Sequence, residues 1–125
     1  MAKILLVDDH PDVVRLLQIC LRDQGHELLT AFDGQKALDL LYAERPDIVI
    51  LDVVMPLVDG LRVLNRIKTD LELHETVVVM LTVQDKPEDV TLGLDIGADF
   101  YLSKPFKPAD VSSLIRRICE TQTVR

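Results

Sequence analysis

The sequence is poor in aromatic residues. Among its 125 residues there is no tryptophan, and phenylalanine and tyrosine together make up 4% of the chain. Because apolar residues still account for 48% of the chain, the hydrophobic core must be built from Val, Leu and Ile. A chain of this length fits one domain, which buries roughly two thirds of its unfolded surface without a disulfide or a metal to stabilise it.

Cysteines and long apolar runs are scarce as well. Cys20 and Cys119 lie far apart, without the paired spacing of a C-x-x-C motif or a metal site. Both fall on apolar stripes of expected helices, which predicts buried free thiols. No apolar run approaches the roughly 20 residues that cross a bilayer, and the first residues do not resemble a signal peptide. We therefore expect a cytoplasmic protein without membrane contact.

Positive charge is in deficit. The chain has 14 Lys and Arg against 21 Asp and Glu, a formal net charge of −7. Since nucleic-acid phosphates require a basic face, this balance argues against direct binding of nucleic acid by this chain. It does not exclude DNA binding by another domain of a longer protein.

What the chain does contain is an alternation of short apolar runs and helical patterns. Most of the runs are continuous, which is typical of strands covered on both faces, and helical stripes with i, i+3, i+4 spacing lie between them. This order predicts an α/β fold of the (βα)5 type, a doubly wound five-stranded parallel sheet with helices on both faces. The expected strands are Ile4–Val7, Leu28–Leu29, Ile48–Leu51, Val77–Leu81 and Phe100–Leu102, and the helical stripes begin near Val13, Ala37, Leu61, Val90 and Val111.

Residues typical of helix ends occur at the borders of these stripes. Proline is tolerated in the first turn, aspartate caps the N-terminus and glycine follows the C-terminus. The candidates are Pro11, Pro87 and Pro108 as first residues, Asp33 and Asp85 as N-caps, and Gly25 and Gly97 as the residues where the first and fourth helices end.

Polar residues follow four of the five expected strands. Asp8 and Asp9 follow the first strand, Asp52 the third, Thr82 the fourth and Lys104 the fifth. Each residue alone is explained by an ordinary turn, cap or surface position. In open parallel sheets, however, ligands bind outside the carboxyl ends of the strands. Their shared position at one edge of the sheet therefore predicts a functional site.

Three carboxylates at one edge need a positive partner. Two charges about 4 Å apart interact by roughly 4 kcal/mol at an effective dielectric constant near 20. Lys104 supplies one positive charge, and a divalent cation would supply the rest, unless a carboxyl group takes up a proton. Ligands that are all oxygen favour Mg²⁺. Asp8 and Asp9 are therefore predicted to hold Mg²⁺ beside Asp52.

A carboxylate beside Mg²⁺ and lysine suits phosphoryl chemistry. A carboxylate can act as a nucleophile and form an aspartyl phosphate, and Asp52 is the candidate. Lys104 and the hydroxyl group of Thr82 can contact phosphoryl oxygens. Positioning and charge neutralisation of this kind are most of what phosphoryl transfer requires.

The chain resembles the receiver domain of two-component response regulators over essentially its whole length. The matching stretches are "ILLVDDH", "PDIVILDVVMPLVDG", "VVVMLT" and "GADFYLSKPF". The resemblance implies a single receiver domain over residues 1–125 with the flavodoxin-like strand order 2-1-3-4-5. It also implies a cis peptide bond between Lys104 and Pro105.

The resemblance assigns a role to each site residue. Asp52 would accept a phosphoryl group from the phosphohistidine of a sensor histidine kinase or phosphotransfer protein. Mg²⁺ would be held by Asp9 directly, by Asp8 mostly through water, by Asp52, and by the backbone carbonyl of Val54. Lys104 would pair with a phosphoryl oxygen.

The resemblance also implies a switch. Thr82 would move inward to hydrogen-bond the phosphoryl group, and Tyr101 would follow it from outside to inside. This motion would reach the surface formed by the fourth helix, the fifth strand and the fifth helix. That surface would control a downstream protein or an output domain missing from this chain, and two copies could form a homodimer through it. The chain departs from the family at Val83, where Ala or Gly is usual, which predicts modest access of small phosphodonors to Asp52.

Two alternatives stay open. An aspartate-nucleophile phosphatase would carry a second Asp as general acid two residues after the nucleophile, but Asp52 is followed by Val53 and Val54. A degenerate receiver that acts only as a protein-binding module would not need the intact acidic, hydroxyl and lysine set. A nucleotide carrier is disfavoured because neither G-x-G-x-x-G nor G-x-x-x-x-G-K-[ST] occurs. We predict a phosphorylation-dependent switch that takes part in its own phosphorylation and dephosphorylation, not an enzyme.

The three histidines do not form a motif. His10, His26 and His74 are scattered along the chain. They are predicted to be ordinary surface or loop residues, although His10 adjoins the acidic site in the sequence.

Overall fold

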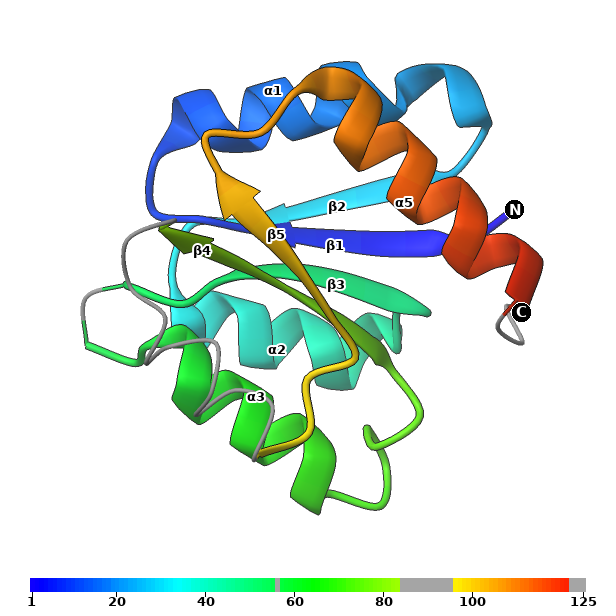
Figure 1. The fold of residues 1–125 in the computed structure, drawn as a ribbon. Coiled ribbons are helices and arrows are strands. Elements are labelled where there is room, and N and C mark those ends of the chain that lie inside the picture. Colours follow the sequence, from blue (N-terminus) through cyan, green and yellow to red (C-terminus); the bar gives the residue numbers. More distant parts are fainter. Residues whose placement is uncertain (56, 84–95, 122–125) are drawn as a thin grey trace.

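Five parallel strands form one sheet with helices on both faces (Figure 1). The structure, a computed structural model, describes residues 1–55, 57–83 and 96–121, with Val83 described for its backbone only. The strands are β1 (Lys3–Val7), β2 (Glu27–Ala31), β3 (Ile48–Asp52), β4 (Val77–Val83) and β5 (Phe100–Lys104). The helices are α1 (Pro11–Leu21), α2 (Gly34–Glu44), α3 (Gly60–Thr69) and α5 (Pro108–Thr121), with a short 3₁₀ helix η1 (Arg22–Gln24).

The order of the strands in the sheet is β2-β1-β3-β4-β5, and every neighbouring pair is parallel. The predicted α/β fold and its strand order 2-1-3-4-5 are therefore confirmed. Helices α1 and α5 cover one face of the sheet, and α2 and α3 cover the other (Figure 1). The predicted fourth helix, with Asp85, Pro87, Val90 and Leu94, lies outside the described residues.

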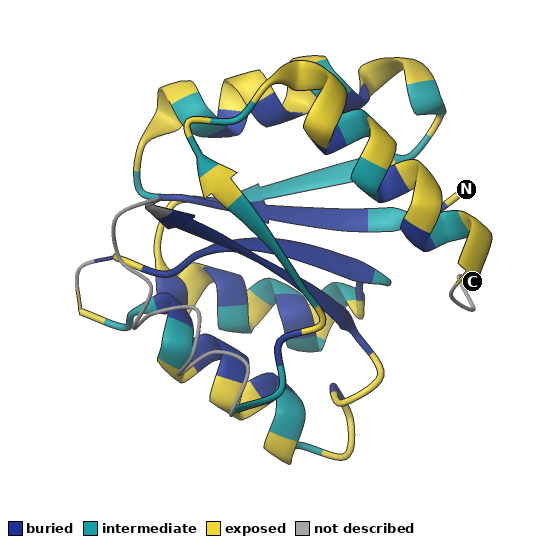
Figure 2. Ribbon diagram, viewed as in Figure 1, coloured by how far each residue is buried: buried dark blue, intermediate teal, exposed yellow. Residues whose placement is uncertain are grey.

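The continuous apolar strands fill both faces of the sheet, because successive side chains of a strand point to opposite sides. All five residues of β3 are buried, as Figure 2 shows for the central strands. On the α2/α3 side lie Leu5, Val7, Val49, Leu51, Val78 and Met80; on the α1/α5 side lie Ile4, Leu6, Ile48, Ile50, Val79 and Leu81. The predicted aliphatic core is present.

The two cysteines are free, as predicted, but they are not buried. Cys20 and Cys119 are half-buried at the margin of the α1/α5 side of the core. The prediction of burial was wrong because both residues lie at the edge of their apolar stripes, where α1 and α5 turn toward solvent.

The ends of the helices follow the predicted residues. Pro11 and Pro108 are the first residues of α1 and α5. Asp33 caps α2, because its carboxylate accepts the Lys36 N–H at 2.7 Å. Helix α1 ends earlier than predicted, and η1 continues the chain to Gly25, whose φ of 77° is the left-handed conformation that glycine adopts without strain. Among the described helices, none combines the length and apolar character that a membrane crossing requires.

Candidate functional site

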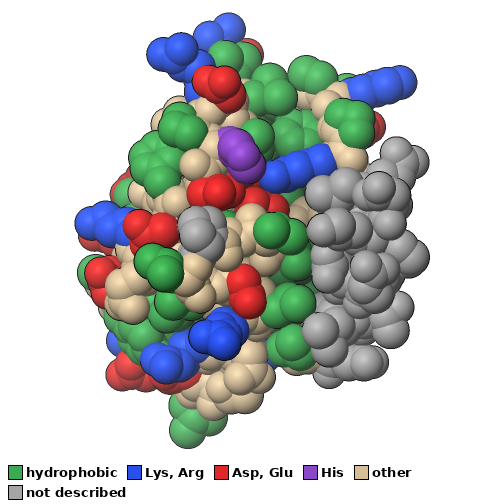
Figure 3. Space-filling model, turned by 90° about the vertical axis from the view of Figure 1, so that its left-hand side faces the viewer, with side chains coloured by type: hydrophobic (Ala, Val, Ile, Leu, Met, Phe, Trp, Pro, Cys, Tyr) green, Lys and Arg blue, Asp and Glu red, His purple; other side chains and the backbone are tan. Residues whose placement is uncertain are grey.

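The carboxyl ends of β1, β3 and β5 bring acidic side chains and a lysine together. Lys104 Nζ lies 2.7 Å from Asp8 Oδ2 and 3.3 Å from Asp52 Oδ1. Asp8, Asp9, His10 and Asp52 each offer a ligand atom, and these atoms all lie within 4.8 Å of one another. Figure 3 looks onto this edge of the sheet, where acidic side chains gather beside a histidine and a basic side chain.

The same aspartates also shape the chain where the strands end. Asp8 Oδ1 accepts the backbone N–H of His10 at 3.0 Å, which turns the chain from β1 toward α1. The Val54 N–H is directed at Asp52 Oδ1, at 3.4 Å. The Asp8 side chain is fully buried and that of Asp52 is 6% exposed. A turn alone does not require burial of this kind, so a second role for both residues is needed.

The charges of the pocket are only partly balanced. Burial, and then the negative charge of Asp8, raise the pKa of Asp52 to about 6, although Lys104 and the Val54 N–H act against this rise. Burial disfavours the charged form of Lys104, but the hydrogen bond that Lys104 donates to Asp8 and the charges of both carboxylates outweigh it, and the pKa of Lys104 is raised. One ammonium group therefore stands among three carboxylates.

The donor atoms fit a divalent cation. Asp9 Oδ1 is buried and has no hydrogen-bond partner among the described residues, and a buried polar atom without a partner is costly. The cluster supplies carboxylate oxygens from three aspartates, which suits a hard cation such as Mg²⁺. The Asp9 oxygen without a hydrogen bond among these residues and the excess of negative charge both suit a bound cation.

The remaining predicted residues lie nearby. Thr82 is 2% exposed and comes directly after Leu81, the residue of β4 that pairs with Asp52. Tyr101 pairs with Met80, is half-buried and packs against the α2/α3 side of the core. The structure thus places Thr82 at the same edge as Asp52 and Tyr101 on the adjoining strand. Their roles in a switch stay predictions.

Two further predictions concern the loops around the pocket. The peptide bond between Lys104 and Pro105 is cis, as the resemblance implied. Val54 as a whole residue is 53% exposed, and the role of its carbonyl group as a metal ligand stays a prediction. The effect of Val83 on access to Asp52 also stays a prediction, because the side chain of Val83 lies outside the described part of the chain.

Sequence reasoning missed the importance of Gly60. A Cβ atom on Gly60 would lie 2.0 Å from the carbonyl oxygen of Asp52, and the Gly60 N–H donates to the Val53 carbonyl at 2.9 Å. The start of α3 is therefore packed directly against the end of β3. The Asp59–Gly60 pair after the third strand was the available signal, since a loop that returns to a strand end often needs a residue without a side chain.

Sequence reasoning also underestimated His10. Its side chain is 69% exposed, as expected of a surface residue, but its Nδ1 lies 3.1 Å from Asp8 Oδ1 and 3.2 Å from Asp9 Oδ1. His10 is thus in contact with the acidic pocket rather than an ordinary loop residue.

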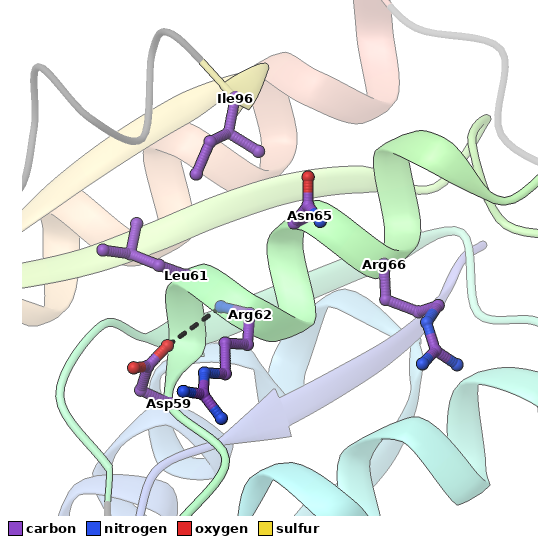
Figure 4. A pocket seen from close by; sticks show the side chains of 6 residues that line it. All are labelled: Asp59, Leu61, Arg62, Asn65, Arg66 and Ile96. Atoms are coloured by element: carbon purple, nitrogen blue, oxygen red, sulfur yellow. Dashed lines mark hydrogen bonds between the residues drawn. The ribbon is translucent and has the colours of Figure 1, made fainter.

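A separate hollow lies along α3 and does not share this chemistry (Figure 4). Asp59 at its end is engaged in capping the helix, because its carboxylate accepts the Arg62 N–H at 2.9 Å. The side chains of Arg62 and Arg66 extend away from Ile96 and do not converge on one point (Figure 4). The acidic pocket is therefore the better candidate for a functional site.

The fold and the pocket together define a class: a flavodoxin-like α/β domain with buried carboxylates at the carboxyl ends of its strands. Residues 4–116 match the response regulator receiver domain, and the chain belongs to this family. The family named from the sequence is thereby confirmed.

Individual relatives agree with this assignment. The chain is 40% identical over 116 residues to the alkaline phosphatase synthesis transcriptional regulatory protein PhoP of Bacillus subtilis (strain 168). That match covers 93% of this chain and 48% of the relative, so the chain spans about half the length of the curated relative.

Solved structures show the same fold. The chemotaxis protein CheY4 of Vibrio cholerae is similar with a TM-score of 0.86 and 34% identity, covering 94% of this chain and 98% of that one. The receiver domain of NtrX from Brucella abortus has a TM-score of 0.87 and 34% identity, covering 96% of this chain and 100% of that one.

Proposed function

We propose that residues 1–125 form a single receiver domain in which Asp52 accepts a phosphoryl group from the phosphohistidine of a sensor histidine kinase or phosphotransfer protein. The observation that carries this proposal is the position of Lys104 between the buried carboxylates of Asp8 and Asp52. With a pKa of about 6, Asp52 is mostly ionised at neutral pH and can act as a nucleophile.

The proposed step is a single displacement at phosphorus. A carboxylate oxygen of Asp52 attacks the phosphorus atom and forms an O–P bond, while the N–P bond of the phosphohistidine breaks. The imidazole leaves with the electron pair and takes up a proton. Lys104 Nζ, 3.3 Å from Asp52 Oδ1, is close enough to neutralise charge on the phosphoryl oxygens. The Thr82 hydroxyl group at the same edge is the candidate neutral donor.

The same proposal assigns the metal ligands. Asp9, Asp52 and the backbone carbonyl of Val54 would hold Mg²⁺, and Asp8, already bonded to Lys104, would act mostly through water. When bound, Mg²⁺ supplies positive charge to the phosphoryl oxygens and so assists the transfer. The unpartnered Oδ1 of Asp9 supports this assignment.

The proposed output is a change of surface. Inward motion of Thr82 and Tyr101 would reach the surface formed by the predicted fourth helix, β5 and α5, and that surface would act on a downstream protein or an output domain or form a homodimer. The named relative in Bacillus subtilis is a transcriptional regulatory protein about twice as long as this chain, which supports an output domain outside it. The proposed action of this chain involves no direct contact with nucleic acid or membrane, and its proposed location is the cytoplasm.

The test is incubation with Mg²⁺ and a small acyl-phosphate donor, followed by intact-mass measurement. Wild type should gain the mass of one phosphoryl group, and Asp52→Asn should gain none. Asp23→Asn, which changes an exposed aspartate of η1, is the matched control and should behave as wild type. No gain in wild type would favour the protein-binding module. Turnover of an ordinary phosphate ester would favour the phosphatase.

A further inference from the structure

The imidazole of His10, whose nitrogen atoms can bind metal ions, lies at the entrance of the acidic pocket. Nδ1 of His10 is 3.1 Å from Asp8 Oδ1 and 3.2 Å from Asp9 Oδ1. The ring is held at this position from its own backbone, because the His10 N–H donates to Asp8 Oδ1 at 3.0 Å and Pro11 begins α1 immediately afterwards. The imidazole is therefore presented to the carboxylates by a defined turn.

The distances are those of neighbouring ligands on one ion. Two atoms bound at about 2.1 Å are about 3.0 Å apart at an octahedral ion and about 3.4 Å apart at a tetrahedral one. The separations of 3.1 Å and 3.2 Å between Nδ1 and the two carboxylate oxygens fall within this interval. Nδ1 therefore lies at a ligand-to-ligand distance from an oxygen of each carboxylate, and the ligand atoms of the cluster all lie within 4.8 Å of one another.

His10 Nδ1 is itself hydrogen-bonded to Asp8 Oδ1 at 3.1 Å, but the other bonds of the pocket make this contact replaceable. Asp8 Oδ1 already accepts the His10 backbone N–H, and Asp8 Oδ2 accepts from Lys104 at 2.7 Å. Asp8 therefore does not depend on the imidazole for a partner. Within the part of the chain that the structure describes, Asp9 Oδ1 is buried and makes no hydrogen bond, although Nδ1 is only 3.2 Å away. Replacing the Nδ1–Asp8 hydrogen bond with an ion bound by Nδ1 and both carboxylates would give Asp9 Oδ1 a partner.

The chemistry of the donors divides metal ions into two groups. Mg²⁺ and Mn²⁺ prefer carboxylate, carbonyl and water oxygens, whereas imidazole suits Zn²⁺, Cu²⁺ and Ni²⁺. We propose that His10 is a further ligand of this pocket for Zn²⁺ and similar transition-metal ions, and that Mg²⁺ binds without it. The inference rests on the proposed function, because it concerns the same cation site. Its consequence is that His10 sets which metal ions compete with Mg²⁺.

The experiment compares wild type, His10→Gln and His74→Gln. Zn²⁺ and Mg²⁺ affinities are measured by calorimetry, and Zn²⁺ is also titrated in the presence of Mg²⁺ to show that both ions use one pocket. His10→Gln should weaken Zn²⁺ binding by about tenfold or more and leave Mg²⁺ binding unchanged. His74, exposed in the loop before β4, is the matched histidine, and His74→Gln should bind both ions as wild type does.

A second readout identifies the ligand atom. In protein labelled with ¹⁵N at histidine, Zn²⁺ should shift the Nδ1 resonance of His10 strongly, and Mg²⁺ should not. Equal Zn²⁺ affinity in wild type and His10→Gln, or an unmoved Nδ1 resonance, would overturn the inference while Mg²⁺ binding and phosphorylation of Asp52 persist. Failure of Mg²⁺ binding and of phosphorylation together would overturn the proposed function, and the inference with it.

Discussion

Lys104 lies closer to Asp8 than to Asp52, the residue that it is proposed to assist. Its Nζ is 2.7 Å from the carboxylate of Asp8 and 3.3 Å from that of Asp52. Both carboxylates are almost completely buried, so one ammonium group compensates two charges that would otherwise repel each other. The pKa of Asp52, about 6, is the balance between burial and Asp8, which raise it, and Lys104, which lowers it.

Removing Lys104 should shift that balance. In metal-free Lys104→Gln, we expect the titration midpoint of Asp52 to rise by about one pH unit or more, because the opposing charge of Asp8 stays and the favourable one is lost. The carboxyl ¹³C resonance of Asp52, followed against pH, measures the midpoint. Lys107→Gln, at an exposed lysine in the loop that follows β5, should leave it unchanged. An unchanged midpoint in Lys104→Gln would show that Lys104 does not act on Asp52.

The raised pKa of Asp52 also predicts how stability depends on pH. The folded-state value of about 6 lies above the ordinary value of 3.8, so the folded state binds more protons between these values and loses stability as pH rises through them. Asp52→Asn should therefore stabilise the metal-free protein near neutral pH, by up to about 3 kcal/mol. Urea unfolding at several pH values measures this gain, which should disappear below about pH 4. A gain that does not change with pH would contradict the assignment.

Much of this architecture could be predicted from the sequence, but the accuracy of the predicted strand bounds depended on where each strand lies in the sheet. β3 was found nearly residue for residue, because a central strand buried on both faces must be continuously apolar. β2 was predicted only as Leu28–Leu29 although it spans Glu27–Ala31. It lies at the edge of the sheet and is mostly half-exposed, so its sequence is under weaker constraint.

In the candidate site as well, some features could be predicted from the sequence and others could not. Asp8, Asp52 and Lys104 could be predicted because parallel strands deliver the residues at their carboxyl ends to one edge. The contacts of His10 and Gly60 could not, since they depend on how loops return across that edge. Such contacts follow from tertiary packing rather than from any periodicity along the chain.

Substitution of Gly60 distinguishes packing from helix propensity. Gly60 begins α3, where alanine would by propensity stabilise the helix by up to about 1 kcal/mol. A Cβ atom would, however, lie 2.0 Å from the Asp52 carbonyl oxygen, which the backbone of β3 cannot easily avoid. Gly60→Ala should therefore destabilise the protein by about 1–3 kcal/mol and slow phosphorylation of Asp52. Chemical denaturation measures whether the free energy of unfolding falls or rises in Gly60→Ala. Asn65→Ala, on the exposed face of α3, is the control. A Gly60→Ala protein more stable than wild type would refute the steric argument.

A hydrogen-bonded chain through His26 joins the start of β1 to α5. The Ala2 N–H donates to His26 Nδ1 at 2.9 Å, and His26 Nε2 lies 3.2 Å from Gln24 Oε1. Gln24 Nε2 donates in turn to the carbonyl of Ser112 in α5 at 2.9 Å. Because a backbone N–H can only donate, Nδ1 must be unprotonated, and the chain of bonds requires a neutral imidazole.

This network predicts a loss of stability in mild acid. Burial, followed by the N-terminal ammonium group, lowers the pKa of His26 below its ordinary value of 6.5. The unfolded chain therefore binds more protons in this range, and stability falls as pH drops through 6.5 toward the folded-state pKa. Urea unfolding at about pH 7.5 and about pH 5.5 should show a larger loss in wild type than in His26→Asn, whose amide oxygen can accept the Ala2 N–H without titrating. His74→Asn should lose as much stability as wild type, and an equal loss in all three proteins would exclude His26 as the titrating group.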